Sequence, residues 1–126
     1  MHLQHNKLTE TPKGLGSMAQ LTALDLSHNT LTTVAPSTYA LKNLEILELH
    51  HNSIASLDNA ICQLTKVKRL DISNNQLTKL PGALSVLKEL EHLDLSYNNI
   101  EVISLTHSLT HLLTYALTHS LIGDPV

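Results

Sequence analysis

The sequence predicts an α/β solenoid, a coil of short repeats with a parallel sheet on its concave face and irregular or 3₁₀-like segments on its convex side. Two observations lead to this prediction. Asparagines recur at an unbroken spacing of 23 residues, at Asn6, Asn29, Asn52, Asn75 and Asn98. A similar framework of aliphatic residues surrounds each of them. A fixed period of this length indicates supersecondary units that stack on one another.

The first half of each repeat is expected to form a short strand. Its alternating pattern, as in Leu24-Asp25-Leu26, turns the leucines inward and leaves the residue between them on the open face. Strands of successive repeats should stack in parallel about 4.8 Å apart. Equivalent residues of successive repeats should therefore form columns across the sheet.

The second half of each repeat is expected to close the core from the convex side. Aliphatic residues recur there at three positions: Val34, Leu57, Leu80 and Ile103; Leu15, Ile61 and Leu84; Met18, Leu41, Leu64 and Leu87. Pro12, Pro36 and Pro81 also fall in this half. A 3₁₀-like path tolerates them because it does not need every backbone N–H in a ladder.

The repeated asparagine is interpreted as structural. At the corner between strand and loop, its amide can pair with backbone groups of its own and adjacent turns. An unpaired buried amide would cost about 1–3 kcal/mol, so we expect the asparagines to build the scaffold rather than to bind a ligand.

Written out, one repeat reads Leu21-x-x-Leu24-x-Leu26-x-x-Asn29-x-Leu31. With its 23-residue length and the Leu80-Pro81 step, the chain resembles the intracellular leucine-rich repeat family, which includes Ras-pathway scaffolds and cell-polarity proteins. The resemblance covers residues 1–103 as five repeats, of which the first is incomplete. It implies a right-handed coil and a non-catalytic role in protein binding.

A tail of another origin is predicted for residues 104–126. Its first part repeats Ser-Leu-Thr-His with a period of four. A CTCA tetranucleotide repeat translates into this order in every frame, and one base change accounts for each of Leu112, Tyr115 and Ala116. Our hypothesis is that residues 104–121 are translated microsatellite DNA; codons that do not descend from CTCA would refute it.

Composition narrows the class of protein. The formal net charge is −3 and no run of Lys or Arg occurs, so a nucleic-acid partner is not expected. The start of the chain lacks the basic and apolar regions of a secretory signal, and Cys62 is the single cysteine, which favours a cytoplasmic protein. No membrane span is expected, because Thr, His and Ser interrupt the apolar residues of the tail.

The exposed strand positions are the predicted protein-binding surface. One column of carboxylates should attract a partner with a basic surface. A neighbouring column adds an apolar side chain, an Arg and a His, and one Tyr lies at the concave edge. The predicted binding residues are Asp25, Ile46, Glu48, Arg69, Asp71, His92, Asp94 and Tyr97.

A column of histidines, His5, His28 and His51, precedes the asparagines, with His50 beside it. We expect a polar ladder there rather than a metal site, because the strand spacing exceeds a comfortable coordination geometry and no carboxylate ligand is matched to it. We also expect no enzyme activity: Cys62 has no histidine base at matching depth, and no phosphate-binding glycine loop occurs. No cofactor, metal or small-molecule substrate is predicted.

The leading interpretation is a non-catalytic protein-interaction module, an intracellular scaffold or adaptor that uses its concave strands. Two alternatives remain open: an incomplete product without autonomous activity, and a fragment of an extracellular leucine-rich repeat receptor. The first repeat begins at its middle, so we expect the chain to be a piece of a longer protein.

Overall fold

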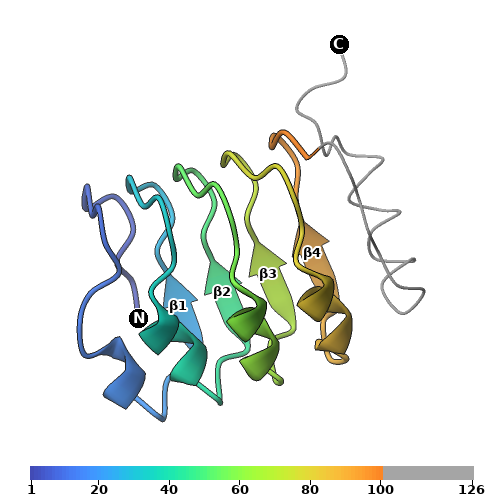
Figure 1. Ribbon diagram of the computed structural model, residues 1–126. Coiled ribbons are helices and arrows are strands. Elements are labelled where there is room, and N and C mark those ends of the chain that lie inside the picture. Colours follow the sequence, from blue (N-terminus) through green and yellow to red (C-terminus); the bar gives the residue numbers. More distant parts are fainter. Residues whose placement is uncertain (101–126) are drawn as a thin grey trace.

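The structure is a computed structural model that describes residues 1–100, apart from the side chains of residues 83 and 85. It confirms the predicted solenoid, in which successive repeats line up along one axis with strands on one side and helical turns on the other (Figure 1). The predicted domain boundary at residue 103 and the predicted tail lie outside the described residues. We name each repeat by its asparagine, so that the Asn52 repeat contains Ile46 to Ile54.

The strands form one parallel sheet on the concave side. They are β1 (Ala23–Asp25), β2 (Ile46–Glu48), β3 (Arg69–Asp71) and β4 (His92–Asp94), in the spatial order β1-β2-β3-β4. The register keeps the 23-residue period, because Leu24, Leu47, Leu70 and Leu93 are direct partners. The backbone ladder continues past the strand ends; for example, the N–H of Leu26 donates to the carbonyl of Glu48 at 2.9 Å.

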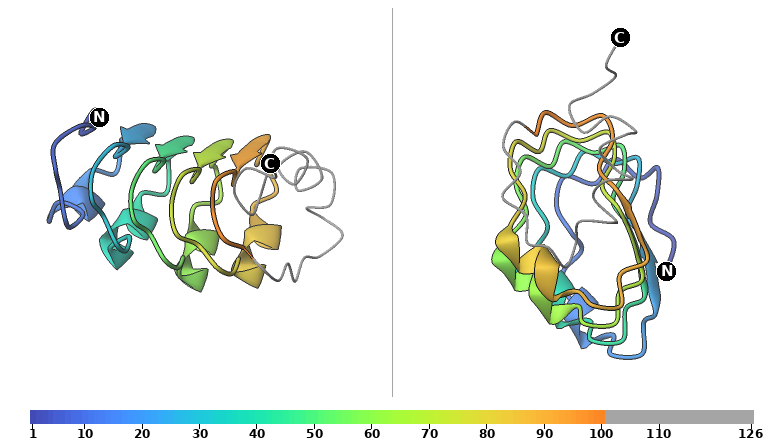
Figure 2. Two further views of the ribbon diagram at one scale, coloured as in Figure 1. Left: turned by 90° about the horizontal axis from the view of Figure 1, so that it is seen from above. Right: turned by 90° about the vertical axis from the view of Figure 1, so that its right-hand side faces the viewer.

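Short 3₁₀ helices form the convex side, as predicted. They are η1 (Leu15–Ser17), η2 (Pro36–Ala40), η3 (Asn59–Gln63) and η4 (Gly82–Val86), and they lie opposite the sheet (Figure 2). Pro36 begins η2 and Pro81 immediately precedes η4, where a missing N–H costs no helical hydrogen bond. Within residues 1–100 no helix has the length and apolar character needed to cross a membrane.

The core is a stack of aliphatic residues between the two sides. The inward leucines of the strands are at most 1% exposed. The convex positions are buried as predicted at Val34, Leu57, Leu80, Leu15, Ile61, Leu84, Leu41, Leu64 and Leu87. Met18 is the exception: it is 42% exposed, and its prediction as a core residue was wrong. Among the described helical turns, η1, which Met18 follows directly, packs against η2 alone, so Met18 is covered from one side.

Four of the five asparagines, Asn29, Asn52, Asn75 and Asn98, are buried and form the predicted polar ladder, whereas Asn6 is exposed and was wrongly included in it. In the Asn75 repeat, Oδ1 accepts the N–H of Ile54 at 2.9 Å, and Nδ2 donates to the carbonyls of Leu49, Ile72 and Ser73 at 3.0–3.1 Å. Asn52 and Asn98 make the equivalent bonds. Each amide therefore ties its own turn to the turn of the preceding repeat.

Two neighbouring residues of η2, Thr38 and Tyr39, each bury a hydroxyl that has no hydrogen-bond partner among the described residues. Thr38 occupies the position of Leu15, Ile61 and Leu84, and it is fully buried. Among the described residues its hydroxyl oxygen has no hydrogen-bond partner. A buried hydroxyl without a partner costs about 1–3 kcal/mol.

Thr38→Val should therefore stabilise the chain, against the usual direction of core substitutions. Valine has nearly the same shape and removes the unpaired hydroxyl, so we expect the free energy of unfolding to rise by about 1 kcal/mol. Urea denaturation followed by circular dichroism measures this change. Thr11→Val is the matched control, because the Thr11 hydroxyl accepts the N–H of Ala35 at 3.2 Å and its loss should destabilise. A loss of stability in Thr38→Val would contradict the assignment.

Candidate functional site

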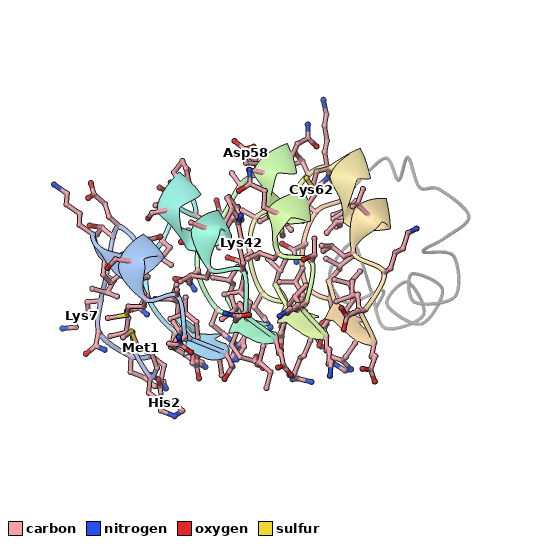
Figure 3. All side chains as sticks on the ribbon, turned by 90° about the horizontal axis from the view of Figure 1, so that it is seen from below. Met1, His2, Lys7, Lys42, Asp58 and Cys62 are labelled. Carbon is pink, nitrogen blue, oxygen red and sulfur yellow. The ribbon has the colours of Figure 1, made fainter. Side chains whose placement is uncertain are left out.

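The strand face brings together all eight predicted binding residues. The register of the sheet places its predicted binding residues in two columns. One column contains Ile46, Arg69 and His92, and the other contains Asp25, Glu48, Asp71 and Asp94. Tyr97 lies just beyond β4 (His92–Asp94), in the turn that follows. Cys62 lies among the helical turns on the opposite side, whereas His2 lies on the strand side (Figure 3).

Three of the four carboxylates in the acidic column are held by a local turn. The Oδ1 atoms of Asp25, Asp71 and Asp94 each accept the N–H of the serine two residues later at 3.0 Å and its hydroxyl at 2.6–2.7 Å. These serines are Ser27, Ser73 and Ser96. The aspartates therefore have a structural role in addition to their charge.

Asp71 is buried, with only 7% of its surface exposed, although the alternating pattern predicted an exposed carboxylate. The reason is that the serine turn folds the short side chain against the backbone, and Arg69 covers it. Arg69 Nη2 lies 3.7 Å from Asp71 Oδ2. A partner therefore meets Arg69 before it meets Asp71.

Glu48 departs from the aspartate–serine pattern of its neighbours. Its Oε1 accepts a hydrogen bond from Arg69 Nε at 2.6 Å, and its Oε2 lies 3.5 Å from His50 Nε2. The hydrogen bond to Glu48, with the charges of Glu48, Asp71 and Asp94, raises the pKa of Arg69 despite its partial burial. The centre of the face is thus a fixed cation between two carboxylates.

Two large side chains stand exposed on this face. Ile46 is 39% exposed and Tyr97 is 49% exposed. The backbone of Tyr97 is left-handed, with φ of 56°, a conformation that costs an L-residue about 1–2 kcal/mol. The exposure of its aromatic ring makes Tyr97 a candidate for binding, whereas its backbone conformation belongs to the repeat turn.

The residues before the asparagines share this left-handed turn. His5, His28, His51 and Asn74 have φ between 54° and 60°, as Tyr97 does. The regular turn stacks the imidazoles: the centroids of His5 and His28 are 4.3 Å apart and those of His28 and His51 are 4.2 Å apart, with rings within 13° of parallel. The predicted histidine column is therefore confirmed as a stack of rings.

The ring of His50 meets this stack edge-on. Its centroid lies 5.2 Å from those of His28 and His51, at 89° and 80° to their planes. Its Nδ1 lies 3.0 Å from Nδ1 of His51. His28, His50 and His51 each present one ring nitrogen within 4.8 Å of the others. His50 and His51 come from the same repeat, so strand spacing separates only His28 from the other two; the expectation that the column His5, His28 and His51 holds no metal stays a prediction.

The pKa of His28 in this cluster and the pKa of the nearby Asp25 are both lowered by their surroundings. Partial burial and the neighbouring rings of His51, His5 and His50 lower the pKa of His28, with only Asp25 opposing them. Burial would raise the pKa of Asp25, but the two hydrogen bonds from Ser27 and the nearby His50 and His2 lower it overall. At neutral pH His28 is therefore a neutral imidazole beside an ionised carboxylate.

Sequence reasoning noted His50 but did not select it. The signal that marks it is its position in the repeat, where the neighbouring repeats have Ser27, Ser73 and Ser96. The Asn52 repeat has Glu48 and His50 where the Asn29, Asn75 and Asn98 repeats have an aspartate–serine pair; the Asn6 repeat departs as well, with His2 and Gln4. A comparison of repeats position by position finds these departures without a structure.

The comparisons with known proteins agree with this architecture. A family model described as "Leucine rich repeat" matches residues 1–54, 19–77, 42–100 and 65–119. The fold is similar to a solved structure of a leucine-rich repeat protein from Leptospira interrogans, with a TM-score of 0.73 and 31% sequence identity. That match covers 98% of this chain, which spans 30% of the length of the Leptospira chain. A comparison with curated proteins gives no significant match.

Proposed function

The chain belongs to the leucine-rich repeat family, and from this premise we propose that it is a non-catalytic protein-interaction module whose strand face binds a protein partner with a basic surface. The observation that carries the proposal is the exposure of two large side chains: Ile46, which pairs with Arg69 in the register of the parallel sheet, and Tyr97, in the turn after β4. Binding energy in protein interfaces concentrates in a few such side chains, of which Tyr and Arg are typical.

Rigidity supports this use of the face. β1, β2 and β3 are held by backbone hydrogen bonds on both sides and β4 by its pairing with β3, and the asparagine ladder ties together the turns that follow the strands. A surface ordered before binding loses little conformational entropy when a partner arrives. A small number of exposed side chains on this face can therefore be enough for useful affinity.

The charge of the face supports a basic partner. Asp25, Glu48 and Asp94 remain partly exposed, and Arg69 offsets only part of their charge. An excess of carboxylates steers a cationic surface toward the sheet and raises the rate of encounter. Association should accordingly weaken as ionic strength rises.

We further propose a cytoplasmic scaffold or adaptor role for the protein. The single free Cys62 supports it, because extracellular domains of this kind usually carry disulfide-bridged ends. The resemblance to intracellular scaffold repeats points the same way.

Two substitutions taken from the chain's own repeats test the binding face. Ile46→Ala copies Ala23, and Tyr97→Asn copies Asn74. Asparagine tolerates the left-handed turn, so Tyr97→Asn should stabilise the fold by about 1 kcal/mol while the double variant weakens partner binding about tenfold or more. The immobilised chain and its variants are used to capture partners, which mass spectrometry quantifies. The affinity of each captured partner for the chain and for the double variant is then measured.

Val86→Ala is the matched control, because Val86 is 50% exposed in η4 on the convex side. Partners should be retained by this control and released by added salt. Partners that are lost with Val86→Ala and kept by the double variant would place the binding surface on the convex side instead.

A further inference from the structure

We propose that His28, His50 and His51 form a binding site for a divalent transition metal ion of the zinc class. One ring nitrogen from each lies within 4.8 Å of the other two. Imidazole nitrogen is a preferred ligand of Zn²⁺, Cu²⁺ and Ni²⁺. Three histidines with an open position for water form a known type of zinc coordination.

The distance between the Nδ1 atoms of His50 and His51 is the central observation. These atoms are 3.0 Å apart, and two nitrogens bound to one zinc ion at about 2.0–2.1 Å lie roughly 3–3.4 Å apart. Their rings meet edge-on at 80° rather than face to face. The pair is therefore set for chelation with little movement.

Glu48 orients His50 for this role. Its Oε2 lies 3.5 Å from His50 Nε2, so it favours the tautomer with the proton on Nε2 and leaves Nδ1 as an acceptor. Arg69 holds the other carboxylate oxygen of Glu48 at 2.6 Å. A carboxylate that fixes the tautomer of a metal-bound histidine is a common supporting arrangement in metal sites.

The proton balance of binding follows from these tautomers. If Glu48 keeps the His50 proton on Nε2, then in the metal-free chain His51 Nδ1–H donates to Nδ1 of His50. Metal binding replaces this proton with the ion, and the His51 proton moves through solvent to its own Nε2. Both rings stay neutral, and no other reactant is needed.

His28 supplies the third nitrogen. Its ring is stacked 4.2 Å from that of His51 and nearly parallel to it, and the lone pair of an imidazole nitrogen lies in the plane of its ring. His28 must therefore turn out of the stack to face the ion. When the metal binds, the His28 ring should lose its stacking contacts with His5 and His51 and coordinate the ion instead.

A second group, Glu48, His50 and Asp71, also lies within coordination distance, but it is already occupied by protein groups. The guanidinium of Arg69 contacts both carboxylates, and Asp71 Oδ1 accepts from Ser73. A cation there would displace Arg69. The three histidines are the site that needs no such displacement.

Zinc titration of the full chain by calorimetry tests the proposal. His50→Ser and His51→Asn copy the residues of neighbouring repeats, Ser73 and Asn74, so both variants should fold, which circular dichroism verifies. The chain should bind one equivalent of Zn²⁺ at the cluster, and each of these variants should bind it at least about tenfold more weakly. Glu48→Gln should weaken it about tenfold.

Two controls separate this site from the other histidines of the chain. His92→Asn removes a histidine on β4 outside the cluster. A triple change of His107, His111 and His119 to Asn removes those of the last 23 residues of the chain. Both controls should retain the bound equivalent. Nitrogen-15 NMR of the histidine rings should show His51 changing from the Nδ1–H to the Nε2–H tautomer when Zn²⁺ is added.

The proposal is overturned if the chain binds no zinc, if His50→Ser and His51→Asn bind it as well as the unmodified chain, or if the triple variant loses all binding. An unchanged His51 tautomer on saturation also overturns it. None of these results depends on a protein partner, so they stand apart from the proposed function of the strand face.

Discussion

Asn75→Ala should destabilise the solenoid by about 4 kcal/mol, a large effect for one side chain that touches no ligand. Its amide makes four hydrogen bonds to the backbone, and Asn75 is 7% exposed. Alanine leaves the N–H of Ile54 and several carbonyls without their partner, and each unpaired buried group costs about 1–3 kcal/mol. Water entering the gap recovers only part of this loss. Chemical denaturation followed by circular dichroism measures the change.

Asn6→Ala is the control for this prediction. Asn6 holds the same position in the repeat but is exposed, so its replacement should change the free energy of unfolding by no more than about 0.5 kcal/mol. Equal losses at the two positions would mean that the asparagine acts through local turn preference rather than through its buried bonds.

Leu70→Ala should cost about 3 kcal/mol. Leu70 is fully buried in β3, between Leu47 and Leu93 in the register, and the loss combines transfer of the side chain with the cavity left behind. Neighbouring repeats contribute to each other's stability in a solenoid, so amide hydrogen exchange should quicken in the flanking strands as well as in β3. Denaturation gives the size of the effect and hydrogen exchange gives its extent.

The exposed Val86 provides the comparison, since Val86→Ala leaves no cavity and should stay within about 0.5 kcal/mol. A faster exchange confined to β3 would indicate that the repeats unfold independently, which would contradict the coupling expected between them.

The fold was predictable because its information is repeated. The 23-residue period predicted the strands, their parallel register, the convex 3₁₀ turns and the asparagine ladder. Where one repeat departs from the pattern, the other repeats still indicate the structure expected at that position. Met18 was mispredicted because the pattern describes a helical turn packed on both sides, whereas η1 packs against η2 alone among the described turns. Thr38 was not recognised as a defect because a single polar residue in an aliphatic column carries no geometric information about its hydroxyl.

The candidate site was predictable in placement but not in contacts. The columns of the strand face follow from the period, so all eight predicted residues share that face. The burial of Asp71 depends on the length of its side chain, the serine two residues later and the reach of Arg69, which a pattern of alternation does not contain. The histidine cluster depends on a left-handed turn that stacks His28 on His51 and on the edge-on approach of His50, and strand spacing alone contains neither of these contacts.

The asparagine ladder also has a direction along the chain. The Oδ1 atoms of Asn52, Asn75 and Asn98 accept N–H groups of residues 21 positions earlier, so a turn receives its acceptor only from the repeat that follows. During synthesis on the ribosome, the N–H of Ile54 must wait until Asn75 has been added. The backbone hydrogen bonds of each turn are therefore completed only when the next repeat has been synthesised. Until then, the newest turn of the nascent chain remains exposed to solvent, to chaperones or to proteases.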